Sequence, residues 1–90
     1  MGGVQRSHEI VRRTLPDGRV MLFEQWGLEP ALGGVTWNVR LESNPGNPAT
    51  GTPLLVVLAL LLGYELVPET WPWWIYALAD DVEAAFAVRP

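Results

Sequence analysis

His8 is the only histidine of the 90-residue chain, and histidine is the side chain best suited to general base catalysis or metal binding near neutral pH. It belongs to no recognisable catalytic motif, and Ser7 and Ser43 stand in no nucleophile elbow. The chain has no cysteine, which excludes thiol catalysis, a disulfide framework and a cysteine-bound metal. We therefore expect a non-enzymatic protein without catalytic residues.

Asp80, Asp81 and Glu83 form the densest group of carboxylates. Carboxylate oxygens suit hard cations, but side chains at adjacent helical positions diverge and no glycine loop gathers them around one point. The pair Gly33-Gly34 is not followed by the Gly-Lys-Ser/Thr of a phosphate loop. These patterns predict a solvated helix face, with no metal, no cofactor and no small-molecule ligand.

The charges are unevenly distributed along the chain. Residues 1–50 carry five arginines and five carboxylates, whereas residues 51–90 carry one arginine and five carboxylates, which gives the net charge of −4. A nucleic-acid-binding protein needs a basic stripe, so this balance disfavours nucleic acid as a partner. The arginines predict weak surface ion pairs instead, for example between Arg12 and Glu24 on neighbouring strands.

The first half of the chain is typical of a β-meander within residues 4–42. Strands are expected over residues 8–15, 19–26 and 35–42, and residues 27–34 connect the last two. The third strand alternates most cleanly, with one apolar face made of Val35, Trp37, Val39 and Leu41. Such alternation predicts an antiparallel strand with one buried face.

The first two strands are joined by the sequence Pro-Asp-Gly at residues 16–18. Proline presets the turn, aspartate can accept from its own backbone, and glycine takes the left-handed conformation. A three-residue hairpin loop of this kind would place Arg13 opposite Met21 and Val11 opposite Phe23.

The second half, residues 52–90, is typical of a helical hairpin. A turn-rich linker over residues 43–51 precedes it, and helices are expected over residues 54–66 and 73–88. The first begins with Thr52 as the cap and Pro53 at the first helical position. We expect one α+β domain over residues 1–90, a three-stranded antiparallel β-meander followed by two helices, the first of them apolar all round.

Residues 54–62 are nine consecutive apolar residues, and such a helix must be enclosed by protein or by lipid. Residues 53–67 would span about 22 Å as a helix, which is less than the roughly 30 Å of a bilayer core. Extension to Tyr76 would reach across but would bury Glu65 and Glu69, although the nearby tryptophans resemble an aromatic belt. A membrane-associated accessory protein with residues 53–76 in or on the bilayer is therefore the alternative function.

The favoured function is a small structural or protein-interaction subunit. A chain of this size buries too little surface to enclose an apolar helix, so the remaining face should meet a partner, most simply a second copy or a larger assembly. Trp74 should pack inside, whereas Trp71 and Trp73 lie at the turn. The expected interaction surface consists of Leu54, Leu55, Leu58, Leu61, Leu62, Trp71 and Trp73. Residues 1–20 lack the apolar core of a signal peptide. We expect a cytoplasmic location, with membrane association as the alternative.

Overall fold

The computed structural model of this protein describes residues 10–26, 36–46, 48–51 and 53–87. The predictions for His8, for the connector over residues 27–34 and for Thr52 as a cap lie outside the described residues. The elements in chain order are the strands β1 (Val11–Thr14), β2 (Val20–Trp26), β3 (Thr36–Leu41) and β4 (Ala49–Gly51), the helix α1 (Leu54–Leu61), the 3₁₀ turn η2 (Pro68–Thr70) and the helix α2 (Trp73–Ala87).

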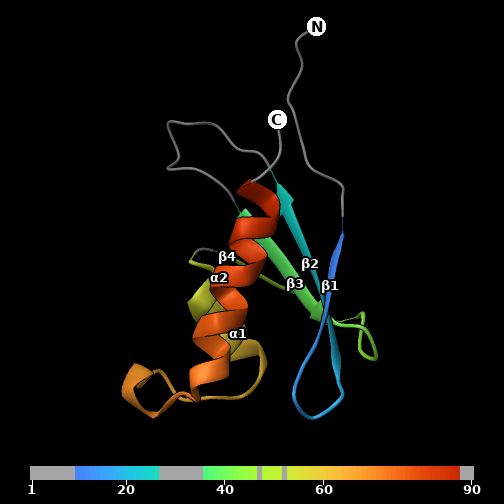
Figure 1. Cartoon of the computed structure of the whole chain (residues 1–90). Coiled ribbons are helices and arrows are strands. Elements are labelled where there is room, and N and C mark those ends of the chain that lie inside the picture. Colours follow the sequence, from blue (N-terminus) through green and yellow to red (C-terminus); the bar gives the residue numbers. More distant parts are fainter. Residues whose placement is uncertain (1–9, 27–35, 47, 52, 88–90) are drawn as a thin grey trace, which may run out of the picture.

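The four strands form one antiparallel sheet in the order β1-β2-β3-β4, and both helices lie on the same face of it (Figure 1). The α+β class and the meander are thus confirmed. The prediction of three strands was short by one, because β4 falls inside the expected linker and pairs with β3 through Val39 and Ala49. Two of the three residues of β4, Ala49 and Gly51, are of types depleted in strands, so its pairing with β3 is a tertiary effect.

The β1–β2 hairpin has the predicted register. Val11 lies opposite Phe23 and Arg13 opposite Met21. The backbone N–H of Leu15 donates to the carbonyl of Arg19 at 2.7 Å, and Gly18 has φ +95°. The left-handed conformation at Gly18 explains why glycine ends the turn, since other L-residues adopt it at a cost.

The core lies between the inner face of the sheet and the two helices. Trp37 of β3 and Phe86 of α2 meet edge to face, with ring centroids 5.3 Å apart. The other large side chains buried in this cluster include Met21, Phe23, Val39, Leu54, Leu58 and Val82. Both helices therefore contribute apolar side chains to one core with the meander.

Helix α1 ends at Leu61, five residues before the predicted end. Gly63 has φ +88°, its N–H donates to the carbonyl of Leu60, and the N–H of Tyr64 donates to the carbonyl of Ala59. These two bonds form a Schellman motif, which ends a helix at a glycine. At the other end Pro53 occupies the N-cap position, whereas it was predicted at the first helical position that follows the cap.

Helix α2 matches its predicted extent as far as Ala87, the last described residue. Its buried residues are Ile75, Ala79, Val82 and Phe86, so Trp74, which was expected to pack inside, lies beside the buried stripe. Trp74 and Leu78 are half-buried instead. The reason is a second small core, in which Ile75 packs with Ala59 and Trp71 and turns α2 toward α1.

Candidate functional site

The leucines of the predicted interaction surface lie mainly inside the molecule. Leu54 and Leu58 are fully buried, and Leu55, Leu61 and Leu62 are half-buried. Within α1 the exposed residue is Leu60, whose relative exposure is 53%. The chain thus encloses most of α1 by itself, because the helix is five residues shorter than expected and packs on both β3 and α2.

The two tryptophans at the turn occupy opposite environments. Trp71 is 6% exposed and packs against Ala59 and Ile75, whereas Trp73 is 78% exposed. The indole N–H of Trp71 donates to the carbonyl of Glu65 at 2.7 Å. Trp71 is therefore a core anchor of the turn, and Trp73 presents its ring to the surroundings.

Exposed large apolar side chains concentrate on the α1–α2 connection and the helix ends that it joins. We call this set the apolar tip; it consists of Leu60, Leu66, Val67, Trp73 and Tyr76. Of these, only Trp73 was predicted as a site residue. Gly63 was the signal in the sequence that could have revealed the others, because a helix that ends there leaves Leu66 and Val67 outside the helix and its packing.

Side-chain hydrogen bonds hold the connection that carries the apolar tip. The hydroxyl of Thr70 donates to the carbonyl of Val67 at 2.8 Å, and the hydroxyl of Tyr76 donates to the carbonyl of Pro68 at 2.7 Å. The indole of Trp71 supplies the third bond, and its ring centroid lies 6.0 Å from that of Tyr76. The connection is thus fixed in one conformation although its apolar side chains face outward.

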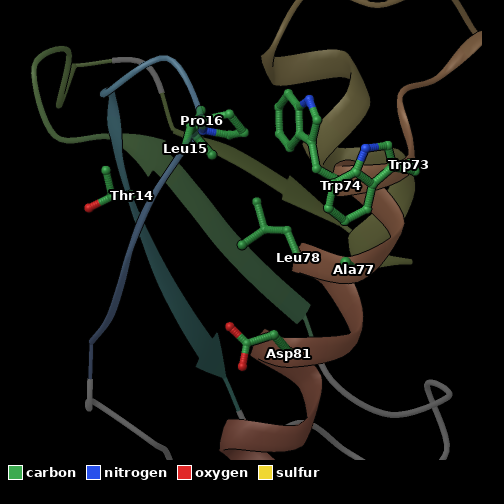
Figure 2. A pocket seen from close by; sticks show the side chains of 8 residues that line it. All are labelled: Thr14, Leu15, Pro16, Trp73, Trp74, Ala77, Leu78 and Asp81. Atoms are coloured by element: carbon green, nitrogen blue, oxygen red, sulfur yellow. The ribbon is translucent and has the colours of Figure 1, made fainter.

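A groove of about 370 Å³ separates the β1–β2 hairpin from α2. Figure 2 shows Trp74, Leu78 and Asp81 following one another along the face of α2 that looks toward the hairpin. The lining is mostly apolar and consists of Thr14, Leu15, Pro16, Trp73, Trp74, Ala77, Leu78 and Asp81. Trp73 belongs to both the groove and the apolar tip, so the two features adjoin.

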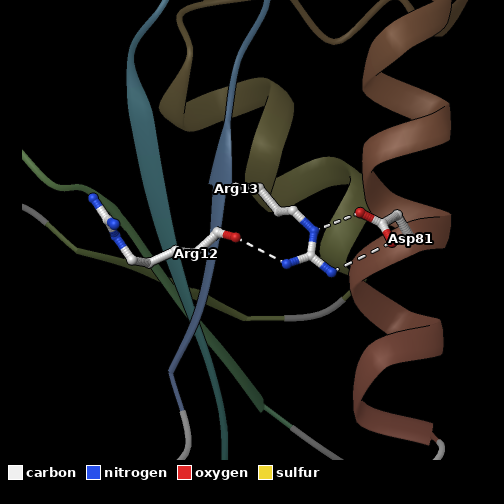
Figure 3. Close-up of polar contacts among 3 residues, drawn as sticks. All are labelled: Arg12, Arg13 and Asp81. Atoms are coloured by element: carbon white, nitrogen blue, oxygen red, sulfur yellow. Dashed lines mark hydrogen bonds and ion pairs between the residues drawn. The ribbon is translucent and has the colours of Figure 1, made fainter.

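Asp81 of the groove is paired with Arg13 of β1 (Figure 3). The Nε and Nη2 atoms of Arg13 donate to the carboxylate at 2.5 and 3.4 Å, and Nη1 donates to the carbonyl of Arg12 at 2.8 Å. The hydrogen bond from Arg13 lowers the pKa of Asp81, and the same bond raises the pKa of Arg13. Asp81 therefore stays ionised and ties β1 to α2, whereas its neighbours Asp80 and Glu83 lie on the exposed face that the sequence predicted.

Two further ion pairs lie on the surface of the sheet. Arg12 pairs with Glu42 at 2.8 Å, so its predicted pairing with Glu24 was wrong. Arg12 lies opposite Leu22, and its long side chain reaches past this residue to the end of β3. At the hairpin turn Arg19 pairs with Asp17 at 2.7 Å, and the hydrogen bond from Arg19 lowers the pKa of Asp17.

The described residues contain no group of three or more side chains placed to hold a metal ion. No helix among them is long and apolar enough to cross a membrane. Among the described residues, the apolar tip and the adjoining groove are features suited to molecular recognition. No protein-family model, curated protein or solved structure matches this chain.

Proposed function

We propose that this protein is a small non-enzymatic interaction subunit that binds a protein partner through the apolar tip. The observation that carries the proposal is the 78% exposure of Trp73, the most exposed large apolar side chain among the described residues. Tryptophan is among the residues most enriched at the energetic centres of protein interfaces. Its position beside a groove fits that role.

The conformation of the α1–α2 connection supports the same proposal. Trp71 and Tyr76 donate to carbonyls of the connection and so order it before any partner arrives. Binding to a surface that is already ordered costs less conformational entropy than binding to a loose one. An ordered connection that exposes Leu66 and Val67 is therefore suited to tight association.

Site-specific photocrosslinking tests this proposal. The photoreactive residue p-benzoylphenylalanine replaces Trp73 in one variant and Glu83, which is exposed further along α2, in a matched control. We expect irradiation of producing cells to give a discrete protein adduct from position 73 and none from position 83. Equal crosslinking from both positions, or none from either, would contradict the proposal.

Attachment to a bilayer surface is the second candidate function, and the exposed rings of Trp73 and Tyr76 favour it. Aromatic rings with one polar atom are enriched at membrane interfaces. Glu65 and Glu69 on the same connection oppose it for anionic membranes, since their charge repels such lipids. Flotation with phosphatidylcholine vesicles, together with light scattering with and without detergent, separates this function from binding to a protein.

A further inference from the structure

We infer that the partner of the apolar tip is a basic segment of a different protein, with an apolar anchor side chain that enters the groove between the β1–β2 hairpin and α2. This inference rests on the proposed function and adds the chemistry of the partner to it. Three observations carry it: the negative charge near the tip, the repulsion expected between two copies of the chain that meet through their tips, and the adjoining groove.

The stretch of sequence that carries the apolar tip is acidic, and Arg13, which reaches the adjoining groove from β1, is paired with Asp81. The sequence holds no lysine, arginine or histidine between Arg40 and Arg89, whereas it holds six carboxylates in that stretch. Two of them, Glu65 and Glu69, are exposed on the same connection as Leu66 and Val67. A partner with basic residues around an apolar centre complements this surface and is steered toward it.

A second copy of this chain is a poor occupant for the same reason. A two-fold contact through the tip would bring Glu65 and Glu69 of both copies into one interface with no basic residue of the tip to balance them, and such an excess of like charge is costly. A contact between the tip and the arginine-bearing sheet meets a different obstacle. Three of the four described arginines, Arg12, Arg13 and Arg19, are already paired with carboxylates, so this region offers the tip little uncompensated positive charge.

The groove supplies the anchor site. Its volume of about 370 Å³ falls within the usual range for ligand pockets, and most of its lining is apolar. Interface hot spots are typically side chains that fill such pockets. Trp73 forms part of the groove and of the tip, so one short segment can place an anchor in the groove and basic residues over the connection.

Three fluorescein-labelled dodecapeptides test the inference. They share the same tryptophan and leucine positions and carry lysine, glutamine or glutamate at all other positions. Fluorescence anisotropy with the full chain at about 50 mM salt should rank the affinities as lysine, then glutamine, then glutamate, with at least about a tenfold difference between the extremes.

Two variants, each with two charge-removing substitutions, show whether the carboxylates of the tip select the basic peptide. The double substitution Glu65→Gln and Glu69→Gln should weaken binding of the lysine peptide by about fivefold and leave the glutamine peptide unchanged. The matched control, Asp80→Asn with Glu83→Gln, removes the same charge from the exposed face of α2. It should keep the affinity for the lysine peptide within about twofold of the original value.

Apolar variants test the anchor. The double substitution Trp73→Ala with Leu66→Ser should lower the affinity for the lysine and glutamine peptides by at least about tenfold. Ala77→Trp, which fills the groove from an exposed helical position, should do the same. Circular dichroism spectra of both variants serve to verify that the fold is unchanged.

The outcomes separate this inference from the proposed function. Equal affinity for the lysine and glutamate peptides would overturn the inference that the partner is basic. So would a loss of affinity for the lysine peptide in the Asp80→Asn with Glu83→Gln control as large as that in the Glu65→Gln with Glu69→Gln variant. Either result leaves the apolar tip as an interaction surface. Concentration-dependent dimerisation that Trp73→Ala abolishes assigns the tip to a second copy and overturns the inference alone. Unchanged peptide binding by the Trp73→Ala and Leu66→Ser variant, or binding to phosphatidylcholine vesicles and to no peptide, contradicts both proposals.

Discussion

The indole N–H of Trp71 donates to the carbonyl oxygen of Glu65 at 2.7 Å, and this bond ties the α1–α2 connection to the core. Trp71 itself is held between Ala59 of α1 and Ile75 of α2. One buried side chain therefore links both helices to the segment between them. It shares with Thr70 and Tyr76 the role of fixing the segment that carries the exposed residues Leu66 and Val67.

The change Trp71→Phe should lower the free energy of unfolding by about 2 kcal/mol, because the smaller ring leaves a gap beside Ala59 and Ile75 and the indole hydrogen bond to the carbonyl of Glu65 is lost. That carbonyl keeps the backbone N–H of Val67 as a donor, so the loss stays moderate. For a chain of this size the melting temperature should fall by roughly 10 °C. Trp73→Phe is the matched control and should change stability by less than about 0.5 kcal/mol, since its ring is exposed. Equal losses in thermal melts would show that Trp73 is also buried in solution.

Gly63 should be sensitive to substitution for a purely conformational reason. It has φ +88°, and a methyl group there would meet no atom within 4 Å, so Gly63→Ala acts only through the backbone. The expected loss is about 1 kcal/mol in urea denaturation. Gly46, which does not have a positive φ, provides the control, and Gly46→Ala should be neutral or slightly stabilising. No difference between the two variants would argue against the Schellman motif at the end of α1.

The elements that the sequence predicted best are those with strong local signals. The Pro-Asp-Gly turn and the alternation around Trp37 and Val39 identified the hairpin, its register and the buried face of β3. The strand β4 was missed because its three residues have no strand pattern, and its position depends on pairing with β3. Local patterns cannot reveal a strand whose stability comes from its neighbour.

The interaction surface was harder to predict than the fold. The nine apolar residues of the run 54–62 indicated that burial was required, but not how much of it the chain provides. That amount depended on Gly63, which shortens α1, and on Ile75, which turns α2 toward it. Consequently the run packs mainly inside, while residues beyond the glycine face outward. Trp71 and Trp73 have the same side chain two positions apart, and only tertiary packing separates their environments.

Two leucines of α1 provide a matched test of how far the chain encloses this helix. Leu58 is fully buried in the core, whereas Leu60 is 53% exposed. Leu58→Ala should cost about 3 kcal/mol through lost contacts and the cavity left behind, and Leu60→Ala should cost less than about 0.5 kcal/mol. Chemical denaturation of dilute protein measures both losses. A large loss for Leu60→Ala that grows with protein concentration would show that this leucine is buried by a second copy.

The ion pair between Arg13 and Asp81 should make stability depend on pH in the acidic range. The hydrogen bond from Arg13 lowers the pKa of Asp81 in the folded state, so the unfolded chain binds the proton more readily. The contribution of the pair is therefore complete above about pH 4 and is lost as the pH falls through the lowered pKa. Because both side chains are partly exposed, solvent screening limits the coupling to about 0.5 kcal/mol.

A double-mutant cycle with Arg13→Met and Asp81→Asn measures this coupling in urea denaturation. We expect a positive coupling energy at about pH 7 that weakens in about 0.5 M salt and falls as the pH is lowered through the acidic range. Asp80→Asn, one position earlier on the exposed face of α2, should leave stability at neutral pH unchanged. A coupling that persists undiminished at the acidic end would mean that the interaction between Arg13 and Asp81 does not depend on the charge of the carboxylate, which would contradict the ion pair as its source.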